Sequence, residues 1–156
     1  MRRKDREITD WQRILDIVRE AKVCRIAFQT GDAPYIVPLS YGWEEVDGKL
    51  SFYFHGARDG RKVELIKEGK AVGFELDAGA SVTGGDAACD YSMDYRSVVG
   101  TGHVELITDN EGKRRALDLL MAHYTDKSGW HFPDAMLRVT GAFKLTVDTL
   151  SAKERK

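Results

Sequence analysis

The sequence predicts a mainly β protein with flanking helices (α+β), built as a small antiparallel barrel. Short apolar segments of strand length follow one another through tight turns, instead of alternating regularly with helices as in a parallel sheet. Two long segments and one short one show helical spacing. The 156 residues contain no repeat and no linker-like stretch, so we predict that residues 1–156 form a single domain.

The composition excludes several classes of protein. Charged residues make up 31% of the chain, yet the formal net charge is -1, which argues against a general nucleic-acid binder. No apolar run has the length of a membrane span, and no signal peptide is visible. We expect a cytoplasmic protein that binds neither nucleic acid nor membranes. Its two cysteines, Cys24 and Cys89, form no C-x-x-C pair and are expected to be reduced, with Cys24 in the core.

The first third of the chain predicts one helix and two strands. Thr9, with Gln12 three residues later, has the form of a capping box, and apolar residues at helical spacing follow to residue 21. Residues 23–29 form a short apolar strand. Residues 35–43 are typical of a longer strand, but Pro38 cannot donate a ladder hydrogen bond. We therefore expect this strand to lie at a sheet edge or to carry a bulge.

The middle of the chain begins with a hairpin at Asp47-Gly48, followed by an aromatic strand over residues 50–55. After a glycine-bounded turn, residues 61–68 predict a short helix that Gly69 closes. Residues 71–76 form another strand. Residues 77–89 contain four glycines and few apolar side chains, and we interpret them as a mobile loop.

The last third predicts a long strand over residues 95–107. Thr108 and Glu111 then form a second capping box, which opens a helix with Leu117 and Met121 in the core. We interpret residues 136–150 as a final pair of strands or one bent strand.

The segment from His55 to Lys62 is the strongest candidate for a binding site. Its glycines, Gly56 and Gly60, allow a sharp turn and a close approach of the backbone to a ligand. Arg61 and Lys62 stand where a helix begins, and two cations at a helix start suit a dianionic phosphate. The spacing alone fits a solvated charged turn equally well, because short basic turns are common and no standard phosphate motif is present.

Other candidate residues carry weaker signals. His123 and His131 flank Trp130, but their spacing matches no common metal site, and we expect no bound metal. The aromatic turn at residues 130–132 either covers a cofactor or packs against the barrel. Cys89 lies in the predicted mobile loop, where it is either incidental or part of a lid.

Four segments together resemble the pyridoxamine-phosphate-oxidase-like flavin-binding proteins, and more narrowly the branch named after the nitroimidazole resistance proteins. The resemblance covers nearly the whole chain in matching order. Its segments are Val37-Pro38-Leu39-Ser40-Tyr41-Gly42, Phe52-Tyr53-Phe54-His55-Gly56-Ala57, Gly60-Arg61-Lys62 and Tyr95-Arg96-Ser97-Val98-Val99-Gly100-Thr101-Gly102-His103-Val104.

This resemblance implies a split β-barrel and a homodimer with two flavin mononucleotide (FMN) sites at the subunit interface. Arg61 and Lys62 fall where the family binds the FMN phosphate. Ser97 falls on the strand that the dimer brings toward the flavin. The remaining cofactor-binding positions that the resemblance implies are Pro38, Leu39, Ser40, Tyr41, His55 and Gly56.

The resemblance also suggests what the protein does. We expect an FMN-dependent oxidoreductase that reduces small acceptors such as nitroaromatic compounds, with His55 as the candidate catalytic residue because imidazole titrates near neutral pH. The alternatives are a non-catalytic flavin carrier or sensor, or a haem or deazaflavin binder on the same fold. Residues 150–156 lack the arginine-and-histidine segment of true pyridoxamine-phosphate oxidases, so oxidation of vitamin B6 phosphates is not expected.

Overall fold

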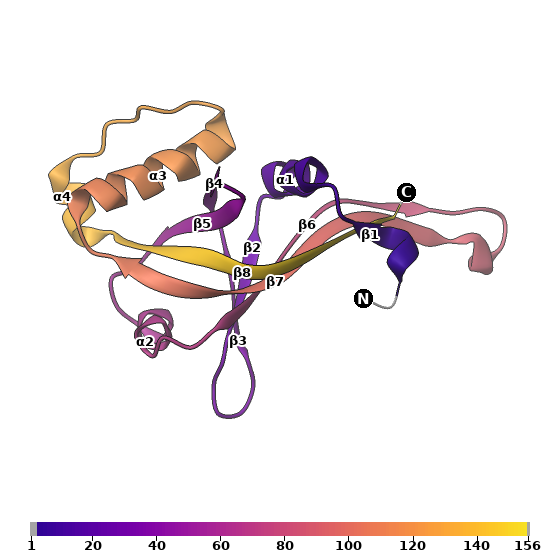
Figure 1. Cartoon of the computed structure of the whole chain (residues 1–156), viewed down its shortest axis with the longest axis horizontal. Coiled ribbons are helices and arrows are strands. Elements are labelled where there is room, and N and C mark those ends of the chain that lie inside the picture. Colours follow the sequence, from indigo (N-terminus) through magenta and orange to yellow (C-terminus); the bar gives the residue numbers. More distant parts are fainter. Residues whose placement is uncertain (1–2, 156) are drawn as a thin grey trace.

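A computed structural model describes residues 3–155. Eight strands form one antiparallel sheet in the order β3-β2-β6-β7-β8-β5-β4, and β1 pairs with β8 (Figure 1). The expected mainly β fold with flanking helices is confirmed. The strands are β1 (Glu7–Ile8), β2 (Cys24–Phe28), β3 (Tyr35–Leu39), β4 (Gly42–Val46), β5 (Lys49–Gly56), β6 (Val72–Thr83), β7 (Ser92–Ile107) and β8 (Gly141–Arg155). The helices are α1 (Trp11–Glu20), α2 (Arg61–Lys67), α3 (Asn110–Thr125) and α4 (Asp134–Val139).

Both long helices begin one residue later than the sequence predicts. The side chain of Asp10, not Thr9, caps α1 by accepting a hydrogen bond from the Arg13 N–H at 3.2 Å. Asp109, not Thr108, caps α3 in the same way. An aspartate stands beside the hydroxyl residue in both places, and its carboxylate satisfies an unpaired backbone donor while complementing the helix dipole.

The predicted long strand over residues 35–43 is two strands. Pro38 lies in β3, an outer strand of the sheet, as the missing N–H required. The break falls after it, at Ser40 and Tyr41, where the chain passes from β3 to β4. The two-residue turn between β4 and β5 is confirmed at Asp47 and Gly48, which both have positive φ angles.

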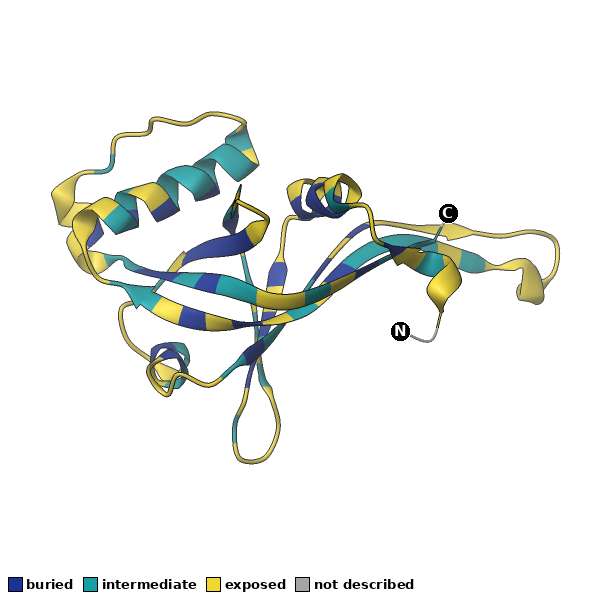
Figure 2. Cartoon of the chain, in the orientation of Figure 1, coloured by how far each residue is buried: buried dark blue, intermediate teal, exposed yellow. Residues whose placement is uncertain are grey.

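The predicted mobile loop over residues 77–89 is wrong for its first half. β6 continues to Thr83 and pairs with β7, so that the two strands form a long arm (Figure 1). The ring of Tyr91 lies against Gly84, where a Cβ atom would come within 2.5 Å of it. Most residues of the outer arm are exposed (Figure 2).

The C-terminal part also differs from the prediction, because residues 134–139 form helix α4 and not a strand. A single long strand, β8, follows and pairs with β1, β5 and β7. Basic side chains hold the end of α4: Lys113 donates to the Leu137 carbonyl at 2.9 Å, and Arg58 donates to the Arg138 carbonyl at 2.6 Å.

The main core lies between the inner faces of the curved sheet and α1, and it includes Cys24, as expected. α3 packs so closely on β4 that a Cβ atom at Gly42 would lie 2.4 Å from the backbone of Leu119. The buried positions of α3 are Lys113, Ala116 and Leu120, whereas Leu117 and Met121 are only half-buried, so their predicted core placement is wrong. Among residues 3–155, no helix is long and apolar enough to cross a membrane.

Candidate basic site at the β5–α2 turn

The segment predicted to bind phosphate joins the end of β5 to the start of α2. β5 ends at Gly56, and Arg61 is the first residue of α2. Gly60 has a φ of 101°, a conformation that residues with a side chain rarely adopt. The glycine therefore allows the turn that places Arg61 and Lys62 side by side at the strand end.

Arg61 reaches from α2 to the first residue of β3. Its guanidinium carbon lies 4.5 Å from the centroid of the Tyr35 ring, within the range of a cation–π contact. Arg61 forms no salt bridge within residues 3–155. Its hydrogen-bonding fork therefore has no carboxylate partner and is available to an anion.

Lys62 points back over the strand end. Its ammonium nitrogen lies 4.8 Å from the centroid of the Phe143 ring. A Cβ atom at Gly56 would come within 2.8 Å of that nitrogen, so the glycine makes room for the charge. Burial lowers the pKa of Lys62, and no carboxylate among the described residues forms a salt bridge with it. A half-buried ammonium of this kind gains stability when an anion binds beside it.

His55 lies on β5 directly before Gly56 and opposite Ala142 of β8. Partial burial of the imidazole lowers its pKa, and the nearby Lys62 ammonium lowers it further. His55 is therefore largely neutral at pH 7 and has one nitrogen that donates and one that accepts a hydrogen bond.

The remaining predicted positions on the neighbouring segment differ in accessibility. Pro38 and Ser40 are exposed, and Leu39 is half-buried. Tyr41 is 0% exposed, and its hydroxyl donates to the Val18 and Ala21 carbonyls at 2.6 and 2.9 Å. Its side chain therefore fastens α1 to the barrel and has no free surface for a ligand in the protomer.

Ser97 lies apart from the other predicted residues. Directly opposed residues on antiparallel strands share a face, and the register places Pro38, Arg25, Glu75 and Val99 in one row across β3, β2, β6 and β7. Ser97, two residues from Val99, is on the same outward face. Three strand spacings, roughly 14 Å, therefore separate Ser97 from Pro38 within one chain.

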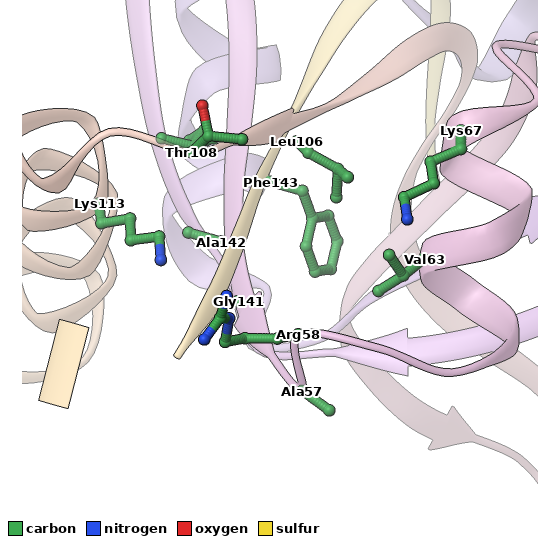
Figure 3. A pocket seen from close by; sticks show the side chains of 11 residues that line it. Ala57, Arg58, Val63, Lys67, Leu106, Thr108, Lys113, Gly141, Ala142 and Phe143 are labelled. Atoms are coloured by element: carbon green, nitrogen blue, oxygen red, sulfur yellow. The ribbon is translucent and has the colours of Figure 1, made fainter. Parts of the chain in front are cut away.

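A pocket of about 280 Å³ opens behind the turn, between α2, α3 and the ends of β7 and β8 (Figure 3). Basic side chains reach it from three places: Arg58 in the turn, Lys67 on α2 and Lys113 on α3. Apolar walls complete it. Its other lining residues are Ala57, Val63, Leu106, Ile107, Thr108, Gly141, Ala142 and Phe143.

The weaker candidates do not form a site. His123 hydrogen-bonds the Ala21 carbonyl through Nε2 at 2.9 Å and so links α3 to the end of α1. His131 and Trp130 are exposed, and Cys89 is an exposed free thiol on the arm. No group of three or more possible metal-ligating side chains gathers anywhere within residues 3–155.

A family model for pyridoxamine 5'-phosphate oxidase matches residues 10–154. The chain belongs to this family. The predicted resemblance is confirmed, and the curved antiparallel sheet is the split barrel of these oxidase-like proteins. No functionally curated protein matches the sequence significantly.

Three solved structures illustrate the likeness. A candidate 5-nitroimidazole antibiotic resistance protein from Bacteroides thetaiotaomicron is 32% identical, with a TM-score of 0.80 over 95% of this chain and 86% of its own. A flavocytochrome from Azotobacter vinelandii is 19% identical, with a TM-score of 0.79 over 100% of this chain and 72% of its own. A FAD- and haem-binding protein from Mycobacterium smegmatis is 22% identical, with a TM-score of 0.79 over 97% and 74%.

Several side chains around the turn of this oxidase-family member carry no functional signal in the sequence. Tyr35 and Phe143 look like ordinary strand residues in the sequence. Their rings form the cation–π contacts with Arg61 and Lys62. Lys67 and Lys113 look like members of solvated helix faces. Only the tertiary arrangement shows their proximity, because each comes from a different element.

The basic surroundings of His55 are open to a direct test. Lys62→Gln is expected to raise the pKa of His55 toward its ordinary value of about 6.5, because the substitution removes a neighbouring positive charge. Titration of the imidazole resonances by NMR measures the shift. Lys67→Gln, on the same helix, serves as the control and should move the pKa less. An unchanged pKa in Lys62→Gln would show that the ammonium does not act on His55.

Proposed function

We propose that this protein binds FMN and acts as a flavin-dependent oxidoreductase on small electron acceptors. The observation that carries the proposal is the Arg61–Lys62 pair at a glycine-bounded strand end, two neighbouring cations that form no salt bridge with the residues that the structure describes. The 32% identical structure is described as a candidate 5-nitroimidazole antibiotic resistance protein, which favours nitroaromatic compounds as acceptors. Two other structures of this fold are described as a flavocytochrome and a FAD- and haem-binding protein.

The residues present fit a flavin mononucleotide. Arg61 and Lys62 would hold the phosphate, and Gly56 leaves the space that a side chain would take from Lys62. Pro38, Leu39 and Ser40 continue from Tyr35, the residue beside Arg61, and would line the ring system with backbone groups. Tyr41 is left out of this site because its side chain is buried.

The flavin, when bound, supplies hydride and electron transfer. The protein's own residues bind, orient and exchange protons. His55, whose pKa is lowered by burial and by Lys62, lies one residue before Gly56 and can donate or accept a hydrogen bond at the cofactor or the acceptor. The phosphate of FMN, close to Lys62, would offset the positive field that lowers the pKa of His55.

The phosphate assignment predicts a difference between two ligands. The double variant Arg61→Gln/Lys62→Gln should weaken FMN binding by about 100-fold or more, because charge-assisted hydrogen bonds to phosphate are lost. Riboflavin, which lacks the phosphate, should bind the variant and the parent almost equally. Flavin fluorescence titration measures both affinities.

Lys70→Gln is the matched control, since it removes an exposed lysine that pairs with Glu68 outside the turn. FMN binding by the double variant as tight as that of the parent would refute the clamp. An equal loss of riboflavin affinity would instead indicate damage to the ring site.

The catalytic role of His55 is tested on the flavin-loaded protein. Consumption of a reduced nicotinamide in the presence of a nitroaromatic acceptor should fall by at least about tenfold in His55→Ala, within the range for loss of a side chain that takes part in proton transfer. FMN affinity should change less than turnover. A variant with normal turnover and weak FMN binding would make His55 a cofactor ligand only. A parent protein that holds FMN but reduces no acceptor would favour a carrier or sensor.

We also propose a homodimer that completes the flavin site through the outward sheet face. Ser97 lies three strand spacings, roughly 14 Å, from Pro38 within one chain, and in the proposed dimer the partner subunit would supply the serine that meets the flavin. The same face presents Val99, which is 50% exposed although its strand, β7, is paired on both sides with β6 and β8.

Val99→Arg is therefore expected to shift the protein toward monomers and to weaken FMN binding at the same time. Analytical ultracentrifugation and flavin titration measure the two effects. Val46→Arg is the matched control, because Val46 is 55% exposed on the β4–β5 hairpin, away from that face. A dimer that survives Val99→Arg would place the interface elsewhere.

A further inference from the structure

The pocket behind the turn has an unusual balance of charge. Three basic side chains line it, Arg58, Lys67 and Lys113, and no acidic side chain does. None of the three forms a salt bridge with any residue in the described range 3–155. Figure 3 shows them arriving from opposite sides around Phe143. Like charges around one hollow repel each other unless a counter-ion joins them.

Lys113 is the most informative of the three. It lies in the first turn of α3 and is only 7% exposed, although the positive end of a helix dipole disfavours a cation there. A buried ammonium needs partners for its three N–H groups. Among residues 3–155 the structure gives it one, the Leu137 carbonyl at 2.9 Å. The other N–H groups can donate to an anion in the pocket.

Arg58, like Lys113, donates one hydrogen bond to a backbone carbonyl and has further N–H groups. One of its terminal nitrogens donates to the Arg138 carbonyl at 2.6 Å, and the guanidinium has other N–H groups. Both contacts end on carbonyls at the close of α4, so holding this helix end is the competing explanation for the two cations. That explanation does not account for Lys67, which lines the pocket from α2.

The pocket differs from the proposed phosphate clamp. Arg61 and Lys62 do not line it. Arg61 extends toward Tyr35 on β3, whereas the pocket faces α3 and the ends of β7 and β8. Phe143 belongs to both sites. Its ring contacts the Lys62 ammonium and also forms part of the pocket wall.

We propose that this pocket is a second binding site, which takes a small organic anion with an apolar body. The carboxylate or phosphate group lies among Arg58, Lys67 and Lys113. The body packs on the apolar wall of Val63, Leu106 and Phe143. The volume of about 280 Å³ suits a single ring or a short chain and excludes a whole dinucleotide. Three cations favour a dianionic phosphate monoester over a monocarboxylate.

The proposal is tested with three probes of similar shape and different charge: phenyl phosphate, benzoate and benzamide. Calorimetric titration of the full-length protein should show phenyl phosphate binding most tightly and benzoate less tightly, with neutral benzamide at least about tenfold weaker than benzoate. Equal binding of benzoate and benzamide, or no binding of phenyl phosphate, would overturn the proposal.

Substitutions locate the site. Lys67→Gln and Arg58→Gln should each weaken phenyl phosphate binding by about tenfold, because each removes one charge-assisted contact. Lys67 is exposed, so its loss leaves the fold intact even if Arg58→Gln loosens α4. Lys127→Gln, an exposed lysine beyond the end of α3, is the control with the same change in net charge. Unchanged affinity in Lys67→Gln, or an equal loss in Lys127→Gln, would reject the pocket.

The test also separates this site from the flavin site. Phenyl phosphate should bind the Arg61→Gln/Lys62→Gln variant with nearly parental affinity, whether or not the parent binds FMN. Saturating FMN should leave a phenyl phosphate site open. Direct competition between the two ligands, together with loss of phenyl phosphate binding in the clamp variant, would show that the anion had used the flavin phosphate clamp and would refute a second site.

Discussion

Strand β5 ends and strand β8 begins at a pair of opposed glycines, and everything that we assign to the basic turn depends on this close approach. Gly56 faces Gly141 at the last step of the ladder. A Cβ atom at Gly141 would lie 2.4 Å from the Ala57 carbonyl oxygen, and one at Gly56 would lie 2.8 Å from the Lys62 nitrogen. With side chains at these positions, the turn would have to move outward, and the Lys62 ammonium would leave the Phe143 ring. The glycine pair thus fixes the position of the charges on both sides of the turn.

The charges held there are costly to the folded chain in the absence of an anion. Burial already lowers the pKa of Lys62, and Lys113 is more buried still. Carboxylates at these places would relieve the cost and would also fill the space that an anionic ligand needs. A protein that leaves such cations without acidic partners gives up some stability, which ligand binding to the native state restores by mass action.

The sequence reveals the parts of this site that are local and hides the parts that are not. The turn from His55 to Lys62, its glycines and the following helix are visible because their signals lie within a few residues. The edge position of Pro38 follows from one missing N–H. Residues 77–83 are misread as part of a loop because their strand structure depends on pairing with β7.

Helix α4 is misread as a strand for a similar reason. Its six residues are too few for a clear helical period. Its closing carbonyls are held by Lys113 and Arg58, which lie 24 and 80 residues away along the chain. The same two long-range contacts form one side of the pocket, so the sequence hides the helix and the second site together. Lys113 itself looks like one more charge on a polar helix.

The short turn at residues 57–60 would couple the two proposed sites. A phosphate on Arg61 and Lys62 and an anion on Arg58 would lie on opposite sides of it, with Phe143 in contact with both regions.

Two effects on the affinity for the second ligand oppose each other in such an arrangement. Ligands of like charge repel each other, which lowers the affinity for the ligand that binds second. The first ligand also restricts the turn, which reduces the ordering that the second must impose and so strengthens its binding. Because coupling between binding sites is reciprocal, the shift that FMN causes in phenyl phosphate affinity must equal the shift in the other direction. Salt separates the two effects, since added ions screen the repulsion and leave the ordering of the turn unchanged.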